Sequence, residues 1–216
     1  MNNERFILEE LPVIEQRADS DGNKTDYIVG YAARFGTWSS EMRHWGKPFK
    51  EKIDSRAFDN VDMSKVVASI NHDFKVLGRA DKGTLELSVD SVGLKYSLKV
   101  PNTTAGRDAL EDVRNGNLAG SSFTFTLKED KWTFKKDQNE PDERTLVKID
   151  KLIELGPVNM PAYPDSSVKL AKRSYDLAKE AEEKTNEESE KELFEKRMRD
   201  LQRKYNYAKL KLSYKK

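Results

Sequence analysis

The chain has 216 residues and a formal net charge of +1 at pH 7, and its charged and hydrophobic fractions are both 36%. This balance gives no general electrostatic argument for a nucleic acid or a membrane surface as a partner, and the lack of cysteine excludes disulfides, thiolate metal sites and a cysteine nucleophile. No apolar run approaches the length of a membrane span and acidic residues interrupt the first one, so we expect a soluble protein made in a cytoplasm, without a signal peptide.

Up to about Leu170, short apolar runs alternate with turn residues, which predicts a strand-rich body. A helix is expected over AGRDALEDVRNGN (105–117), with Thr103 or Thr104 as its N-cap, and a second over DSRAFDNVDMS (54–64). The expected strands, in chain order, are FILEELPVI (6–14), YIVGYAARF (27–35), VVASI (66–70), TLELSV (84–89), GLKYSLKV (93–100), SSFTFTL (121–127), KWTFKK (131–136) and TLVKIDKLIEL (145–155).

The last part of the chain differs in composition from the body. Residues 171–216 contain no Gly or Pro and are rich in Glu, Lys, Arg, Leu and Ala, which predicts one or two exposed helices. Residues 179–195 are mainly acidic and 196–216 mainly basic, with an apolar a/d seam too short to decide between a coiled coil and a solvated helix resting on the body. We therefore divide the chain into a body, 1–170, and a charged helical tail, 171–216.

Two adjacent serines stand at the start of a predicted strand, in the stretch AGSSFTFTL. Because side chains alternate across a strand, Ser121 shares the aromatic, core-facing side and Ser122 opens onto the polar side. Gly120 permits close backbone approach, and successive amides at such a bend can converge on one point. These are the elements of a serine nucleophile beside an oxyanion hole, although serine is also common at strand starts for no catalytic reason.

A serine nucleophile needs a general base, and the chain has only two histidines. His44 lies in the polar, turn-rich SSEMRHWGKPF, where a surface position is expected. His72 ends the predicted strand VVASINHDF and is better placed to be held rigidly, although a histidine in such a place more often has a structural role, capped by Asp73 or a backbone carbonyl. The strand TLVKIDKLIEL offers Asp150 and Glu154 on one face to orient the imidazole, and their spacing does not choose between them.

Five stretches between about Tyr27 and Ser166 carry a resemblance to a known family. They are GYAARFG, FKEKIDSRAF, INHDFKVLGRA, RDALEDVRNGNLAGSSFTF and IDKLIELGPVNMPAYPDS. In this order they are similar to the first signature strand, the stretch before a Gly-Ala-Phe turn, the His-Asp motif, the helix with G-x-S-x-x-F, and the closing strand of the HK97-type prohead serine proteases of tailed bacteriophages. Each motif is weak alone, and the set is specific in its order. The departures are the Asp in FKEKIDSRAF, where the family often has Pro-Gly, and the GPVNMP turn.

The resemblance implies a catalytic triad and a fold. It places the nucleophile on Ser122, the base on His72 and the third member on Glu154, with Asp150 as the fallback. It implies a herpesvirus-protease-like α+β fold, a mostly antiparallel, distorted β-barrel flanked by helices, followed here by the charged C-terminal helical tail. The activity expected is that of a serine endopeptidase without a cofactor or a metal.

The resemblance also implies a place of action and partners. Such enzymes are packaged inside the newly assembled procapsid in the host cytoplasm. There they digest a scaffold protein, or the scaffold-like segment of the major capsid protein, and often themselves. The charged tail could bind scaffold or the capsid interior before self-cleavage removes it, and a homo-oligomer is an open possibility.

Other classes of protein fit the sequence less well. A catalytically silent scaffold or assembly protein would lack Ser122 or His72, and both are present. A nucleic-acid-binding module could use the basic region 196–216 with its tyrosines, but the acidic block before it competes for that charge. Two distant histidines without an HExxH motif leave too few ligands for a metal hydrolase, and GSSFTF lacks the second glycine of an α/β-hydrolase nucleophile elbow.

Overall fold

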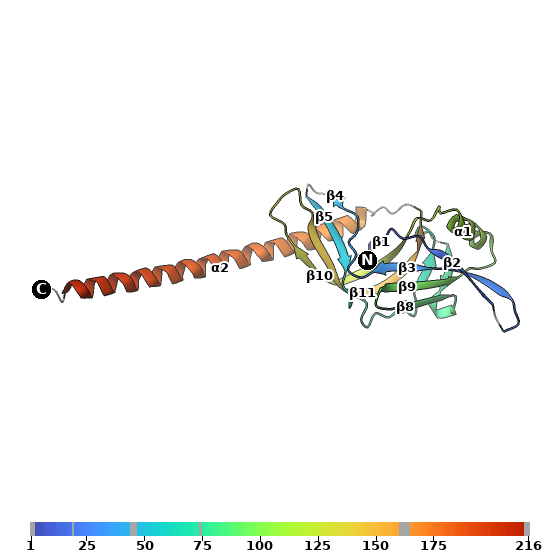
Figure 1. Cartoon of the computed structure of the whole chain (residues 1–216), viewed down its shortest axis with the longest axis horizontal. Helices are drawn as coiled ribbons and strands as arrows, with labels where there is room; N and C mark the ends of the chain where they lie inside the picture. The colour runs from blue at the N-terminus through green and yellow to red at the C-terminus, as the bar shows by residue number, and fades with distance from the viewer. Residues whose placement is uncertain (1–2, 19, 44–46, 74, 160–164, 214–216) are drawn as a thin grey trace. The chain divides into compact units, whose positions relative to one another are not determined.

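The structure is a computed structural model of the chain, and it describes residues 3–18, 20–43, 47–73, 75–159 and 165–213. The chain separates into two compact units, Met1–Ser174 and Tyr175–Lys216. Every strand of the described residues lies in the first unit, and the second unit consists of the continuation of the long helix α2 (Asp165–Ser213) (Figure 1). In the described part of the chain, no helix is both long and apolar enough to cross a membrane.

The larger sheet of the first unit has seven strands arranged around two long ones. Strands β10 (Gly120–Thr133) and β11 (Asp142–Val158) pair antiparallel, and β1 (Glu4–Leu8) pairs antiparallel with the free side of β10. On its other side, β11 pairs in parallel with two strands, β5 (Pro48–Ile53) and β6 (Val67–Ser69). The short strands β4 (Met42–Arg43) and β7 (Val76–Arg79) extend β5 and β6.

The second sheet has four antiparallel strands in the order β2 (Val13–Ala18), β3 (Lys24–Arg34), β9 (Gly93–Lys99) and β8 (Leu85–Val89). Figure 1 shows β3, β9 and β8 side by side. An isolated parallel bridge from Phe35 to Ile53 links the end of β3 to β5 of the first sheet. The architecture is therefore mixed α+β, built from two open sheets.

A cluster of phenylalanines forms the centre of the core. Phe123 and Phe125 on β10 have no exposed area, and their ring centroids lie 5.0 Å apart. Phe6 and Phe58 each lie 5.7 Å from Phe123 in tilted contacts, the geometry that aromatic pairs favour. The prediction that the aromatic face of this strand is buried is confirmed.

The first helix, α1 (Thr104–Arg114), is close to the predicted one. The Thr103 side chain caps it by accepting a hydrogen bond of 3.2 Å from the Gly106 amide, which satisfies one of the free amides of the first turn. Gly116 follows the last turn with a φ of 70°, a backbone conformation that glycine adopts at little cost. Of the two N-caps expected, Thr103 and Thr104, the structure has Thr103.

The prediction of a second helix over residues 54–64 is wrong. The segment forms successive turns, with the Asp59 amide bonded to the Arg56 carbonyl and Asn60 at a φ of 62°. The Asp54 and Asp62 carboxylates accept backbone hydrogen bonds two residues further along. Such local side-chain bonds offer the backbone an alternative to helix, which is why aspartate favours turns.

Two other expected boundaries also differ. The expected strand 6–14 breaks into β1 and β2, because the Glu10 amide turns back to the Leu8 carbonyl at 3.0 Å and Pro12 has no amide to continue the ladder. The runs SSFTFTL and KWTFKK form one strand, β10, whose pairing with β11 absorbs several register shifts. One such shift, between Thr124 and Phe125, leaves Ile153 without a cross-strand partner.

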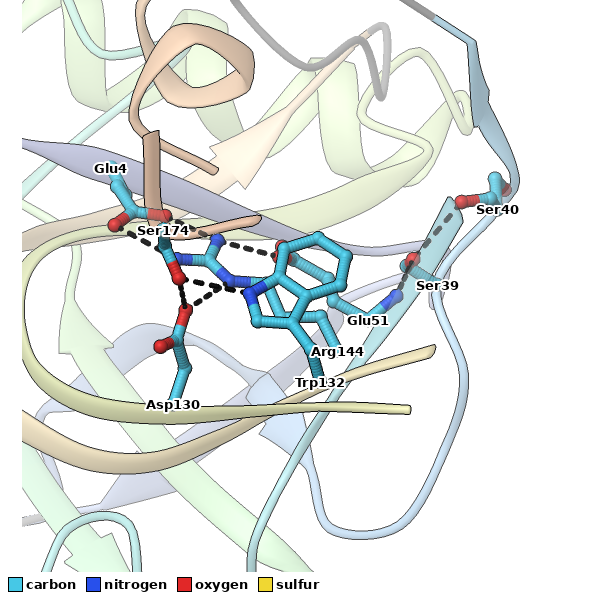
Figure 2. A network of polar contacts seen from close by, with 8 residues as sticks. All are labelled: Glu4, Ser39, Ser40, Glu51, Asp130, Trp132, Arg144 and Ser174. Carbon is cyan, nitrogen blue, oxygen red and sulfur yellow. Dashed lines mark hydrogen bonds and ion pairs between the residues drawn. The ribbon is translucent and has the colours of Figure 1, made fainter. Parts of the chain in front are cut away.

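A buried arginine joins four strands of the larger sheet (Figure 2). The side chain of Arg144 on β11 is 1% exposed and donates to Glu4 at 2.6 Å, Glu51 at 3.2 Å and Asp130 at 2.7 Å. Burial raises the pKa of Glu51 to about 7, since the attraction of Arg144 does not offset it and the charge of Glu4 adds to it. Ser174 extends the network by donating to Asp130 and accepting from the indole of Trp132. We call Arg144 with its three carboxylates the arginine cluster.

Candidate active site

The two serines at the start of β10 point to opposite sides of the sheet. The Ser121 hydroxyl lies 3.0 Å from the hydroxyl of Tyr96 in the core. The Ser122 hydroxyl lies 2.8 Å from Nε2 of His72 and donates at 3.0 Å to the backbone carbonyl of Phe6 on β1. The predicted alternation is confirmed, and Ser122 faces the polar side of the strand, but that side is buried here. Ser122 has no exposed area, because His72 and the adjacent strand β1 lie against it.

His72 lies in a turn after β6, not at the end of a strand as predicted. Asn71 and His72 have φ angles of 54° and 56°, the left-handed region that non-glycine residues rarely occupy. The end of β11 holds this turn in place. The Asn71 amide donates to the Pro157 carbonyl at 3.1 Å, and the Asn159 amide donates to the Asn71 side chain at 2.8 Å. A conformation that costs about 1–3 kcal/mol per residue persists only where its surroundings determine it, as these bonds do.

Glu154 faces the other nitrogen of the same imidazole. Its Oε2 lies 3.3 Å from Nδ1 of His72, and the Thr124 hydroxyl lies 3.4 Å from that nitrogen. The Ser69 hydroxyl donates to Oε1. Burial raises the pKa of Glu154, but the hydrogen bonds from His72 and Ser69 outweigh it and hold the pKa below its usual value. Glu154 is therefore ionised at neutral pH, and its charge is available to orient the imidazole of His72.

Asp150 lies elsewhere. It is exposed and accepts a hydrogen bond of 3.1 Å from Thr126. The sequence placed it on the same face as Glu154, but the register shifts on both sides of Thr126 remove the regular alternation between the two carboxylates. The structure thus brings Ser122, His72 and Glu154 together and leaves Asp150 apart. His44 lies outside the described residues.

The arrangement is a hydrogen-bonded chain of hydroxyl, imidazole and carboxylate. With Nδ1–H donated to Glu154, Nε2 of His72 carries a lone pair aimed at the Ser122 hydroxyl, the arrangement that activates a serine. Among the described residues, no group of three or more His, Asp or Glu side chains lies close enough together to hold a metal ion. The chemistry that Ser122, His72 and Glu154 can supply is nucleophilic attack with general acid–base assistance.

Sequence reasoning missed four participants. They are the hydroxyls of Ser69 and Thr124, the side chain of Asn71 and the backbone carbonyl of Phe6. Ser69 and Thr124 follow from strand alternation once the facing strands are known. The pair Asn-His before Asp is typical of a turn and could have corrected the strand prediction for His72. The carbonyl of Phe6 has no signal in the sequence.

One family of known proteins matches most of this chain. The profile of the family described as Caudovirus prohead serine protease matches residues 13–181, which include Ser122, His72 and Glu154. Among solved structures, the capsid assembly protease of bacteriophage T4 is similar, with 10% sequence identity and a TM-score of 0.42 over 74% of this chain and 99% of that one. No curated protein matches the chain. The chain belongs to the prohead serine proteases of tailed phages, and it is a serine protease of phage capsid maturation.

Proposed function

We propose that Ser122, His72 and Glu154 are the catalytic triad of this protease. The observation that carries the proposal is the 2.8 Å contact between the Ser122 hydroxyl and Nε2 of His72, with Glu154 at 3.3 Å from Nδ1. His72 takes the proton of Ser122 as the hydroxyl attacks the scissile carbonyl, and returns it to the leaving amine. Glu154 holds the imidazole in the required tautomer and stabilises its cation. A water molecule then hydrolyses the acyl-enzyme by the same route.

The resting site holds its nucleophile in a second hydrogen bond. The single proton of Ser122 can be donated to His72 or to the Phe6 carbonyl, and both acceptors lie within 3.0 Å. Only the first orientation starts the reaction. Because Ser122 has no exposed area, a substrate carbonyl reaches it only after the groups that cover it move. The described conformation is thus a closed state of the site.

The proposed substrates are the scaffold protein, or the scaffold-like segment of the major capsid protein, cut inside the procapsid in the host cytoplasm. Membership of the prohead protease family supports this substrate class. The proposed fold is the distorted barrel of the herpesvirus-protease type. Its support is the bridge from Phe35 to Ile53, which joins the two sheets around one phenylalanine core.

Co-expression with the capsid and scaffold proteins of the same phage tests this function. Wild-type protein should shorten one of these proteins at a defined bond, identified by intact-mass analysis. The Ser122→Ala protein should leave both at full length, and the matched Ser121→Ala protein should still cut. Capsid and scaffold proteins that stay intact with the wild type, while another protein is cut, would contradict the substrate class. Equal cleavage by the Ser122→Ala protein would contradict the nucleophile.

We also propose that the body, 1–170, cuts off the charged tail, 171–216, between about residues 165 and 195. The tail has an acidic segment at 179–195 with few apolar side chains, so it can unfold locally at small cost and enter an active site. Purified wild-type protein should therefore shorten with time, while the Ser122→Ala protein stays at full length. A wild-type chain that remains intact while it cuts a capsid substrate would disprove the self-cleavage.

A further inference from the structure

Ser69 is the last residue of β6, and its side chain faces Glu154. The residue is 1% exposed, and its hydroxyl donates to Oε1 of Glu154. The other oxygen of the same carboxylate, Oε2, faces Nδ1 of His72 at 3.3 Å. Oε1 of Glu154 thus accepts from the Ser69 hydroxyl, which takes no part in the proposed proton transfer. Oε2 faces the imidazole of His72, which does take part.

The backbone fixes Ser69 against β11. The parallel register places Val67 beside Glu154 and Ala68 beside Leu155. The Ser69 carbonyl then lies so close to Gly156 that a Cβ atom on that glycine would stand 1.9 Å from it. Only a residue without a side chain permits this approach. The main chain of Ser69 is therefore fixed against β11, and its buried hydroxyl lies where it holds one oxygen of the Glu154 carboxylate.

The imidazole has a competing neighbour, so the position of Glu154 matters. The Thr124 hydroxyl lies 3.4 Å from Nδ1, almost the same distance as the carboxylate. A hydroxyl can donate to an unprotonated Nδ1, whereas a carboxylate can only accept from a protonated one. The tautomer with Nδ1–H leaves Nε2 free to take the proton of Ser122, and the other tautomer does not. A carboxylate that turns away would leave the choice to Thr124.

We propose that Ser69 is a positioning residue that holds the Glu154 carboxylate on Nδ1 of His72 and so selects the tautomer that can act as a base. This inference rests on the proposed triad. It adds a fourth side chain, which touches neither the substrate nor the reacting atoms and acts only through Glu154.

The variants are chosen to separate positioning from packing. Ser69→Ala removes the donor, and Ser69→Thr restores a hydroxyl. Ser69→Cys fills the space with a weak donor, and it carries the test if the alanine variant does not fold. Ser97→Ala is the matched control, because Ser97 is also a buried strand serine, and in the described part of the chain its hydroxyl has no hydrogen-bond partner. Thermal unfolding of each full-length variant reports its fold.

The first readout is independent of any substrate. The chain has only two histidines, so histidine-selective ¹⁵N labelling in a His44→Gln background leaves the imidazole of His72 alone in the spectrum. At about pH 8, above the usual titration range of imidazole, the wild type should show Nδ1 protonated and Nε2 unprotonated. The Ser69→Ala protein should lose this clear assignment and show a mixture of tautomers. Ser69→Thr and Ser97→Ala should keep it.

The second readout is cleavage of a peptide that spans the bond mapped in the capsid or scaffold substrate. Loss of one hydrogen bond to a charged group predicts that kcat falls about 10- to 100-fold in Ser69→Ala, with KM unchanged. An unchanged His72 spectrum, or an unchanged kcat in folded protein, overturns the positioning role. If Ser122→Ala cuts as fast as the wild type, the proposed triad fails instead, and the spectrum alone decides whether Ser69 holds the contact between Glu154 and His72.

Discussion

Two buried polar networks lie at opposite ends of the ladder between β10 and β11. At the start of β10, Ser122 contacts His72, whose other nitrogen faces Glu154. At the far end, Arg144 contacts three carboxylates. Strand β1 takes part in both, since the Phe6 carbonyl accepts from Ser122 and the Glu4 carboxylate accepts from Arg144. The same two strands thus support a reactive group at one end and a fixed one at the other.

The networks differ in their balance of charge. In the first, one carboxylate meets one imidazole and a neutral donor, and the pKa of Glu154 is held low despite its burial. In the arginine cluster, three carboxylates share one guanidinium, and the pKa of Glu51 rises to about 7. A network with enough donors for its carboxylate keeps that carboxylate charged, as the proposed role of Glu154 requires. A network with too few cations leaves one carboxyl partly protonated near neutral pH, which suits a structural role.

The largest effect is expected from a variant that removes the Ser122 hydroxyl from its contact with His72. Ser122→Ala should reduce the cleavage rate on the order of 10⁶-fold, because the nucleophile is lost. Ser121→Ala removes a hydrogen bond to Tyr96 in the core, which costs about 1 kcal/mol of stability and leaves the reaction intact. The rates of both variants on the mapped peptide, with their urea unfolding curves, check this. A slow Ser121→Ala beside a fast Ser122→Ala would reverse the assignment of the two faces.

A smaller effect is expected when the Glu154 carboxylate is replaced by an amide. Glu154→Gln keeps the shape but removes the charge that fixes the tautomer, so kcat should fall by about 10⁴-fold. Asp150→Asn is the control, because Asp150 contacts Thr126 and not the imidazole, and its rate should equal that of the wild type. The measurement is kcat on the same peptide. Loss of activity in the asparagine variant alone would transfer the third role to Asp150.

The structural network is tested through its single cation. Arg144→Met leaves three buried carboxylates without their cation, and the free energy of unfolding should fall by about 3–5 kcal/mol. Arg56→Met is the control: its side chain is 83% exposed, and its ion pair with Asp59 contributes under about 1 kcal/mol. Urea unfolding at neutral pH measures both. Equal stability of the two variants would mean that the arginine cluster contributes no more than a surface pair.

The smallest predicted effect concerns the pH dependence of stability. The pKa of Glu51 is raised in the folded state, so its contribution is fully present below the usual glutamate value and is lost as pH rises to about 7. The full contribution is about 3 kcal/mol. Glu51→Gln mimics the protonated form, so its stability relative to wild type should increase between ~pH 5 and ~pH 8.

Unfolding in urea at both pH values measures this change, with Glu140→Gln as the exposed control. Glu154 works in the opposite direction. Its pKa is lowered on folding, so its contribution is present above the usual glutamate value and is lost as pH falls. A Glu51→Gln protein with the same pH dependence as wild type would show that Glu51 does not carry the extra proton of the arginine cluster.

Local patterns in the sequence predicted the elements that depend on near neighbours. The alternation in β10 separated Ser121 from Ser122, and Thr103 was found as a cap from its position before a helical run. The prediction of His72 as part of a strand failed, because two consecutive left-handed residues end β6 before it. The family resemblance selected Glu154 over Asp150, and the residues alone could not.

The remaining features depend on contacts between distant segments. The burial of Ser122 follows from the Phe6 carbonyl, a backbone group 116 positions away that no side-chain pattern encodes. The irregular spacing of Asp150 and Glu154 follows from register shifts in the pairing of β10 with β11. The arginine cluster collects residues from four strands, and an isolated Arg144 in a strand gives no sign of its partners.

The wide separation of these segments affects how the newly made chain acquires activity. His72 and Glu154 are 82 positions apart and are joined through the parallel pairing of β6 with β11, which forms only after β11 has been synthesised. Folds dominated by such non-local pairing form in milliseconds to seconds, more slowly than helical proteins. Until β11 is made, Glu154 is not in the chain, and His72 lacks the carboxylate that faces it in the folded protein. With the proposed triad, a nascent copy of this protease therefore gains activity only once β11 has been made and paired with β6.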